Sequence, residues 1–335
     1  KYTKLTIANQ VVEKSRKNLL IHDGHSISLL FACHMDTTPP QFGKYQPLRP
    51  TIKNDRLYGL GAKDMKGGTA CLLSAVAEIK NTKGLAILFY VDEELELLGM
   101  RNFVNKPLLP KLLKPKLIIS PESQFVIGHG NRGIIGLEYK VTGEAAHSAR
   151  PHEGLNAITV STEAFAEIAQ KITTMQHPKL GNSVATLTYL IGGSGLTKNN
   201  RPERRMNVVP NVTELDFSVR TSVQKLNAPY VDKLFKKAIT IRGASVKLIR
   251  TVHNYPAQYI SPHHLKPLTE SIIESGLKPQ FGSPHNRGYN DVAMIANKLG
   301  VPYANFGPRG GNNHGPDEYV NIKTLKPTVQ IFKTL

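Results

Sequence analysis

The chain has 335 residues, a formal net charge of +18 and a hydrophobic content of 40%. This length exceeds the size at which one hydrophobic core usually stops growing, so we expect two domains. No apolar run approaches the roughly 20 residues that a transmembrane helix needs, which excludes a helical membrane-spanning protein.

The positive charge could indicate a nucleic-acid partner. However, the lysines are scattered along the chain, which has no zinc-finger spacing, no aromatic RNA-binding signature and no dense basic tail. We therefore expect neither a nucleic-acid nor a membrane partner. We interpret the charge as a solvated basic surface that helps to collect anionic substrates.

Cys33 and Cys71 are the only cysteines, and neither belongs to a CxxC pair. Both lie in apolar runs, as buried core thiols do. This usage favours a reducing compartment and argues against thiolate zinc sites, so we predict a cytoplasmic protein. Because the chain opens at Lys1 rather than methionine, we also expect that a native N-terminal piece is missing from it.

The first part of the chain predicts strands and helices in alternation. Residues 18–33 predict a β-hairpin with its turn at 22–25, and the proline-rich residues 37–56 predict a surface loop. Three further elements follow: a helix at 69–80 and strands at 85–91 and 116–120. The unbroken apolar run of the first of these strands is typical of a parallel sheet with both faces covered.

At Gly133 the pattern changes to alternating polar and apolar residues. The elements that follow are strand 135–141, helix 155–172, strands 183–191 and 212–220, helix 228–239 and strand 245–252. This β-α-β-β-α-β order is that of a split ferredoxin-like unit. After residue 255 the α/β pattern returns, with helices near 264–275 and 291–299 and a strand at 301–306.

These elements predict two domains of different class. Residues 1–133 and 253–335 form a discontinuous α/β domain with a mostly parallel central sheet flanked by helices. Residues 134–252 form an inserted ferredoxin-like α+β domain.

A glycine-dense loop at 58–68 carries Asp64 and runs directly into the first predicted helix. It is not a dinucleotide fingerprint, because Asp64 stands where the third glycine belongs, and no Gly-Lys-Ser/Thr follows at phosphate-loop spacing. We interpret the loop as one that presents a carboxylate, since glycines permit tight turns in a crowded site. The alternative is an aspartate that caps the helix.

Histidines and acidic residues follow the predicted strands, at the edge of the sheet where ligands bind in open α/β folds. They are His34, Asp36, Asp64, Glu93, Glu94, Glu122 and His314. Imidazole and carboxylate groups without thiolates suit zinc, or cobalt or manganese. Five ligands suffice for two ions if one carboxylate bridges them, so we predict two divalent metal ions.

Asp36 lies on the same strand face as His34 and could fix its tautomer. Of Glu93 and Glu94, which follow an apolar strand, one could bind metal while its neighbour acts as base. Each residue also has a simpler interpretation: a core histidine for His34, a solvated turn for Glu93 and Glu94, a surface acid for Glu122 and a turn residue for His314.

Six segments together resemble the metal-dependent amidohydrolases that include acetylornithine deacetylase, succinyl-diaminopimelate desuccinylase, aminoacylase and glutamate carboxypeptidase. The segments are CHMDT at 33–37, LYGLGAKDMKGG at 57–68, DEE at 92–94, GEAAHSARPHEGLNAI at 143–158, NVVP at 207–210 and HGPDEY at 314–319. The resemblance runs from about His34 to Leu335. It implies a catalytic α/β domain with a two-zinc site and an inserted lid domain that usually dimerises.

The resemblance also implies a role for each site residue. It assigns His34 and Glu122 to one metal ion, Glu94 and His314 to the other, and Asp64 to both as a bridge. It makes Glu93 the general base and Asp36 the residue that orients His34. It implies that His147, on the lid, polarises the substrate carbonyl, often from the partner subunit. It also implies that Asn207 and Arg220 bind the substrate carboxylate. The Pro-Glu-Ser order at 121–123 departs from the common Glu-Pro-Thr/Ser of the family.

Two of these lid residues have simpler alternatives. Arg220 could form a surface ion pair with Asp216, and His147 could be a turn residue that caps the following helix.

We therefore predict a two-metal hydrolase that cleaves the amide bond of an N-acyl amino acid or a related small carboxylate substrate, as deacetylases and desuccinylases do. We also expect a homodimer. The alternatives are a dipeptidase or carboxypeptidase of the same family and, from another class, a basic binding protein that lacks the chemistry. The presence of Glu93 argues against the last, because a binding module needs no general base.

Overall fold

The computed structural model describes residues 5–335, which form two compact units. Unit 1 contains the described chain up to His129, together with Ile260–Ser283 and Asn290–Leu335. Unit 2 contains Gly130–Tyr259 and Pro284–Tyr289. Each unit has a hydrophobic core of its own.

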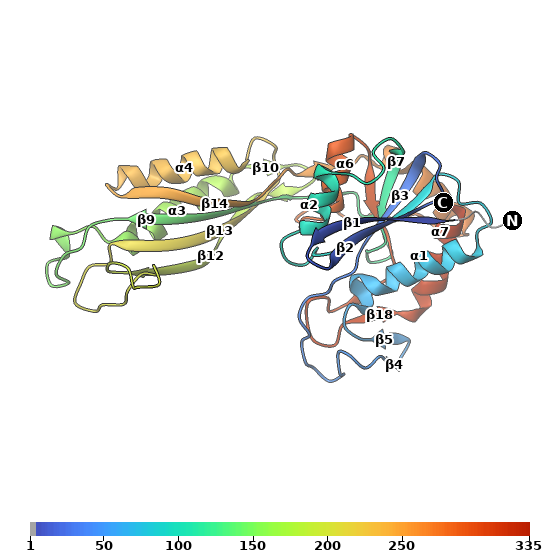
Figure 1. The fold of residues 1–335 in the computed structure, drawn as a ribbon, viewed down its shortest axis with the longest axis horizontal. Coiled ribbons are helices and arrows are strands. Elements are labelled where there is room, and N and C mark those ends of the chain that lie inside the picture. The colour runs from blue at the N-terminus through green and yellow to red at the C-terminus, as the bar shows by residue number, and fades with distance from the viewer. Residues whose placement is uncertain (1–4) are drawn as a thin grey trace. The chain divides into compact units, whose positions relative to one another are not determined.

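Unit 1 is built on a six-stranded sheet (Figure 1). Across the sheet the strands are β1 (Thr6–Glu13), β2 (Arg16–His22), β6 (Leu85–Tyr90), β3 (Ile27–His34), β7 (Leu113–Ser120) and β16 (Tyr303–Asn305). The last four run parallel, whereas β2 is antiparallel to both of its neighbours. The predicted α/β class with a mostly parallel central sheet is confirmed, and the carboxyl ends of β6, β3 and β7 meet at one edge.

Helices cover both faces of this sheet. Successive strand residues point to opposite faces, and β3 and β6 are apolar along almost their whole length, so both faces have apolar side chains to bury. Phe31 and Cys33 of β3 belong to one core cluster with residues of α1 (Gly67–Glu78), α5 (Lys266–Glu274) and α7 (Leu325–Thr334). On the other face α2 (Leu98–Asn105) and α6 (Val292–Leu299) pack against each other and against the sheet. Short helical segments are η1 (Ala62–Lys66), η3 (Pro262–Leu265) and η4 (Ile322–Thr324).

The hairpin predicted for residues 18–33 is wrong. β2 and β3 are both present, but β6 lies between them and forms hydrogen bonds with each. β2 instead forms a hairpin with β1. The physical reason is that β6 is apolar on both faces and therefore takes a central position, which displaces the strand that follows β2 in the chain.

The loop predicted at residues 37–56 contains more structure than expected. β4 (Thr51–Lys53) lies within it and pairs with β5 (Arg56–Tyr58), whose first residue ends the predicted loop. This pair continues into β18 (Tyr319–Asn321) and β17 (Gly310–Gly311) to form a second sheet of unit 1. Strands of two or three residues have no detectable periodicity, and β5 pairs on its other side with β18, which is far away in the sequence.

Unit 2 is the predicted ferredoxin-like unit. Its antiparallel sheet has the order β12 (Val184–Gly193), β13 (Val212–Thr221), β9 (Gly133–Thr142) and β14 (Ser245–Tyr255). The helices α3 (Ala157–Thr173) and α4 (Ala228–Ile241) share a core cluster with buried residues of β9 and β13, against which partly buried residues of β12 and β14 pack. Asn156 and Asn227 cap the two helices: the side chain of Asn156 accepts two backbone N–H groups of the first turn of α3, and that of Asn227 accepts one of α4. Shorter elements are β8 (Gly130–Asn131), η2 (Pro151–Glu153), β10 (Gln176–His177), β11 (Gly181–Asn182) and β15 (Gln258–Tyr259).

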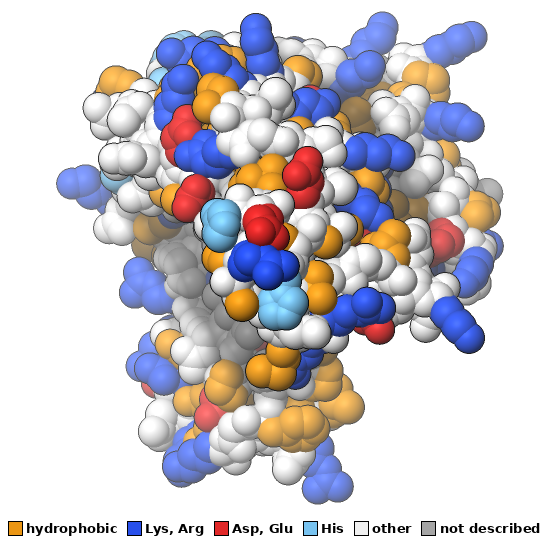
Figure 2. Space-filling model, turned by 90° about the vertical axis from the view of Figure 1, so that its left-hand side faces the viewer, with side chains coloured by type: hydrophobic (Ala, Val, Ile, Leu, Met, Phe, Trp, Pro, Cys, Tyr) orange, Lys and Arg blue, Asp and Glu red, His pale blue; other side chains and the backbone are white. Residues whose placement is uncertain are grey.

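The basic residues are distributed rather than concentrated. On the face that Figure 2 shows, Lys and Arg side chains are scattered among uncharged, acidic and histidine side chains. Across residues 5–335, no helix combines the length and the apolar character that spanning a membrane requires.

Candidate active site

His34 ends β3 and is buried. Its Nδ1 atom is 3.1 Å from the backbone oxygen of Asp36, and its Nε2 atom is 3.1 Å from Oδ1 of Asp64. Because a backbone oxygen can only accept, Nδ1 carries a proton and the lone pair of a neutral imidazole is on Nε2. Two acceptors then face each other across 3.1 Å, an arrangement that a proton or a metal ion satisfies.

Asp36 contacts the site in a different way from the expected one. Its backbone, not its carboxylate, makes the closest contact with His34; the carboxylate Oδ1 lies 3.8 Å from Nδ1. The carboxylate accepts the backbone N–H groups of Glu93 at 3.2 Å and Glu94 at 3.0 Å. Asp36 therefore joins the turn after β3 to the turn after β6.

Glu93 and Glu94 follow β6 in a turn that begins at Asp92, whose φ of 67° is in the left-handed region. Asp92 is buried, pairs with Arg16 and accepts the backbone N–H groups of Glu96 in the turn and of Leu98, the first residue of α2. The Asp92 carboxylate therefore stabilises the turn and belongs to none of the candidate metal-binding groups described for residues 5–335. Oε2 of Glu94 lies 3.1 Å from Nε2 of His314.

Asp64 lies between the two histidines. The loop before it turns at Gly61, where a φ of 70° favours glycine. While Oδ1 of Asp64 faces His34, Oδ2 lies 3.4 Å from Nε2 of His314 and accepts a hydrogen bond from Asn313 at 3.2 Å. One carboxylate thus reaches both histidines through different oxygens, as a bridging ligand does.

Glu122 follows the carboxyl end of β7 and is partly buried. The side-chain amides of Asn290 and Asn305 both donate to its Oε1 atom. The departure of residues 121–123 from the family's order therefore leaves a carboxylate beside the other candidates.

The candidate ligand atoms form overlapping groups in which all atoms lie within 4.8 Å of one another. Two groups share Asp64: one is His34, Asp64 and Glu122, and the other is Asp64, Glu94 and His314. A third combination is His34, Glu93 and Glu94. The first two correspond to the two predicted metal sites.

The crowding of carboxylates shifts their pKa values. Burial raises the pKa of Glu122 to about 7, and burial together with the charge of Asp291 raises that of Glu93 well above its usual range. Burial would also raise the pKa of Asp64, but the hydrogen bonds with His314 and His34 hold it below its usual range. A cluster of this kind is stabilised by added positive charge.

The histidines respond to the same carboxylates. Burial alone would lower the pKa of His34, but its hydrogen bond with Asp64 and the charges of nearby glutamates raise it to about 10. The hydrogen bond with Asp64 also raises the pKa of His314. Without another cation, protons on these imidazoles balance the carboxylates.

Sequence reasoning assigned no role to Asn290, Asn305 or Glu318, which the structure brings to the site. Glu318 accepts backbone N–H groups of Gly61, Lys63 and Asp64. It lies in the same HGPDEY segment as His314, so the motif contained a signal for it. The asparagines are adjacent to Glu122 only through the fold and had no local signal.

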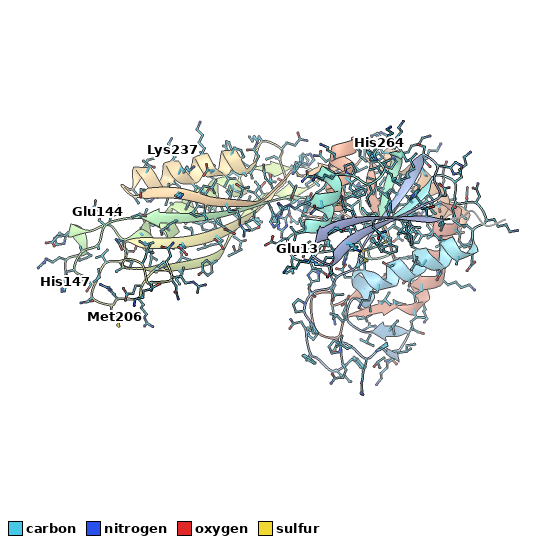
Figure 3. All side chains as sticks on the ribbon, in the orientation of Figure 1. Glu13, Glu144, His147, Met206, Lys237 and His264 are labelled. Atoms are coloured by element: carbon cyan, nitrogen blue, oxygen red, sulfur yellow. The ribbon has the colours of Figure 1, made fainter. Side chains whose placement is uncertain are left out.

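His147 and Asn207 lie together in unit 2. His147 is exposed and forms a β-bridge with Val208, while the backbone N–H of Ser148 donates to the backbone oxygen of Asn207 at 3.0 Å. Figure 3 labels His147 at one end of this unit, near Met206 and Glu144. These residues precede β13 at its Val212 end.

Arg220 lies at the other end of β13. From Val212 to Arg220 an antiparallel strand advances about 27 Å. Burial and the nearby charge of Arg132 lower the pKa of Arg220. Among the hydrogen bonds and ion pairs described for residues 5–335, none joins Arg220 to Asp216, so the surface pair considered as an alternative is not formed.

Comparison with known proteins places this chain in a family. The sequence profile of peptidase family M20/M25/M40 matches residues 30–335. An acetylornithine deacetylase of Aliivibrio fischeri strain MJ11 is 37% identical over 334 residues, which cover 97% of this chain and 85% of the relative.

Two solved structures share the fold. A tripeptidase of Staphylococcus aureus Mu50 has a TM-score of 0.74 at 21% identity and covers 98% of this chain and 87% of its own. The YXEP protein of Bacillus subtilis, described as a dinuclear metal-binding peptidase, has a TM-score of 0.68 at 14% identity, with coverages of 98% and 86%. The chain therefore belongs to peptidase family M20/M25/M40, whose members are hydrolases that act on amide bonds.

Proposed function

We propose that the protein is a two-metal amidohydrolase that removes the acyl group from an N-acyl amino acid or a related small carboxylate. The observation that carries the proposal is the pair of ligand groups that share Asp64. His34 and Glu122 complete one site, and Glu94 and His314 complete the other.

The donor set fits two divalent ions. Three carboxylates and two imidazoles converge, no thiolate takes part, and the carboxylates outnumber the histidines that can balance them. Such a set suits zinc, and also cobalt or manganese. The dinuclear description of the Bacillus subtilis relative agrees with this count.

Glu93 is the proposed general base. When bound, the two ions would polarise the scissile carbonyl and lower the pKa of a nearby water toward about 7. Glu93 would take the proton from the attacking water and return it to the leaving nitrogen. Burial raises the pKa of Glu93, which suits a group that must both accept and donate a proton.

Substrate contacts are proposed for unit 2. Arg220 would bind the substrate carboxylate, because its guanidinium is half-buried and lies near a second cation, Arg132. Asn207 would provide a further contact and His147 would donate to the carbonyl oxygen. We propose that unit 2 acts as the lid and dimerisation domain of a cytoplasmic homodimer.

Identity to acetylornithine deacetylases favours deacylation, while the fold shared with a tripeptidase keeps a dipeptidase or carboxypeptidase as the second candidate. A non-catalytic binding protein is disfavoured by the presence of Glu93 beside both ligand groups.

The test is a hydrolysis screen of N-acetyl and N-succinyl amino acids and dipeptides with added zinc, cobalt or manganese. We expect one acyl class to be cleaved, chelation to abolish cleavage, and the protein to bind close to two ions. Cleavage confined to dipeptides would favour the peptidase. A protein that binds no ion, or an activity that chelation leaves untouched, would contradict the two-metal proposal.

A further inference from the structure

Glu122 is the only proposed ligand that receives two side-chain amides among the hydrogen bonds of residues 5–335. Asn305 donates from Nδ2 to Oε1 of Glu122 at 2.9 Å, and Asn290 donates from Nδ2 to the same oxygen. Both bonds go to Oε1 and neither goes to Oε2. The two oxygens of this carboxylate are therefore in different environments.

The amide of Asn290 is oriented by the helix that follows it. Its Oδ1 atom accepts the backbone N–H of Val292, the first residue of α6, at 3.0 Å. An amide has its oxygen and its NH2 group on opposite sides, so this bond directs the NH2 group away from the helix. The start of α6 thus aims a donor at Glu122.

Asn305 is held by the sheet. It ends β16, pairs in register with Ser120 of β7, and exchanges backbone hydrogen bonds with Gly128 at 2.9 and 2.8 Å. Ser120 lies just before the turn that contains Glu122. The backbone of Asn305 is therefore fixed relative to the carboxylate that its side chain contacts.

We infer that Asn290 and Asn305 are positioning residues. They hydrogen-bond to Oε1 of Glu122, so that only Oε2 is available to bind the metal ion that Glu122 shares with His34 and Asp64. The inference rests on the proposed function. Glu122 would then offer one oxygen, and His34, Asp64 and Glu122 would be three protein ligands of the kind that a catalytic zinc site uses.

The chemistry of the amide suits this role. Carboxamides donate without carrying charge, so they stabilise the ionised carboxylate without replacing the positive charge of the ion. A lysine or arginine at either position would neutralise Glu122 and compete with the metal. An acid would add a further ligand. Groups that hydrogen-bond to metal ligands typically change metal affinity by about 10- to 100-fold when mutated.

Two variants separate this role from general stability. Asn305→Leu removes the donor at similar volume. Asn290→Ser retains a side-chain oxygen that can accept a backbone N–H at the start of α6, but the shorter side chain cannot reach Glu122. Asn102→Leu is the matched control, because Nδ2 of Asn102 donates to the backbone oxygen of Leu98 at 3.0 Å, within α2. Folding of each is checked by circular dichroism.

The measurements are calorimetric titration of the metal-free protein with zinc and the visible absorption of the cobalt-loaded protein. We expect both variants to bind the ion of the His34, Asp64 and Glu122 site about 10- to 100-fold more weakly than the wild type does. We also expect weaker cobalt absorption, because a Glu122 freed to bind through both oxygens raises the coordination number, and tetrahedral cobalt absorbs most strongly. The control should resemble the wild type in both.

An unchanged cobalt spectrum in the folded variants would overturn the inference even if affinity falls, because a lost hydrogen bond alone could weaken binding. Loss of cobalt absorption in Asn102→Leu would also overturn it. A wild-type protein that binds no ion would overturn the proposed function itself, which distinguishes the two failures.

Discussion

The carboxylate of Glu318 accepts a hydrogen bond from the backbone N–H of Asp64, with 2.9 Å between nitrogen and oxygen. It also accepts the N–H groups of Gly61 at 2.6 Å and Lys63 at 3.0 Å, and only 6% of Glu318 is exposed. The same segment contains His314. One segment therefore supplies one proposed ligand and fixes the loop that carries another.

Glu318→Gln should lower the free energy of unfolding by about 1–3 kcal/mol, because a buried backbone N–H loses its acceptor. It should also weaken ion binding, since the loop of Asp64 is less well held. Chemical denaturation and calorimetric titration measure the two effects. Asp317→Asn is the control, because Asp317 accepts backbone N–H groups of Lys44 and Tyr45, outside that loop. Equal loss of ion binding in both variants would exclude a specific role for Glu318.

Glu93 and Glu94 should separate by function. Glu93→Gln should retain both ions and lose about 10²- to 10⁴-fold in kcat, because the proton carrier is gone. Glu94→Gln should weaken one ion, because Glu94 lies 3.1 Å from His314 in the second ligand group. Metal analysis of the purified variants, paired with kcat, makes the comparison. The reverse pattern would assign the base to Glu94.

The fold was largely predictable because its signals are local. The apolar run of β6 and the alternation in β9 and β13 reflect burial that each strand has by itself. The order of strands in the sheet is not local. Nothing in residues 18–33 indicates that β6 separates β2 from β3, and the joining of Pro284–Tyr289 to unit 2 had no sequence signal.

The candidate site divides in the same way. His34 ends an apolar strand, and Glu94 and Glu122 follow two others, so their convergence at one sheet edge could be predicted from the sequence. The contacts of Asp36 could not be predicted. The geometry of the turn decides whether the backbone or the carboxylate of Asp36 faces His34. The amides of Asn290 and Asn305 come from other elements and reach Glu122 only in the folded chain.

Asp291 gives a pH-dependent prediction. Tyr90 donates to its Oδ1 at 2.7 Å, and His34, Asp36 and Glu93 are the nearby titratable groups. Burial raises its pKa from 3.8 to about 7, so between these values the folded protein binds more protons than the unfolded chain and stability falls as pH rises.

In metal-free protein, the stability of Asp291→Asn relative to the wild type should therefore increase as the pH is raised from about 4 to about 8. Only the wild type has to ionise a buried Asp291 over this range. Denaturation curves at both pH values measure the difference. A stability difference that does not change with pH would show that Asp291 is not the titrating group.

Arg220 should act on substrate carboxylates. Arg220→Lys keeps the charge but loses the planar pair of donors that matches a carboxylate, so KM should rise for carboxylate substrates. The matched measurement uses the amide or ester form of the same substrate, for which the wild type and the variant should be alike. Equal effects on both substrate forms would point to a structural role for Arg220.

The last prediction is that His147 acts on the active site of the partner subunit. Within unit 2, His147 and Asn207 lie near the Val212 end of β13, and Arg220 lies near the other end, about 27 Å along the strand. One small substrate cannot contact both ends of the same unit. Two chains, each supplying one end, would satisfy both contacts, as a symmetric dimer does.

Complementation tests this arrangement. His147→Ala should lose about 10²- to 10³-fold in rate if His147 donates to the developing oxyanion, and Glu93→Gln should be nearly inactive. When the two variants exchange subunits, one site of each mixed dimer has an intact Glu93 and receives an intact His147 from its partner, so activity should return. Mixing two preparations of Glu93→Gln is the control and should restore nothing. If mixed dimers form, as mass spectrometry can establish, yet remain inactive, or if the active wild type is a monomer, His147 must act within its own chain or not at all.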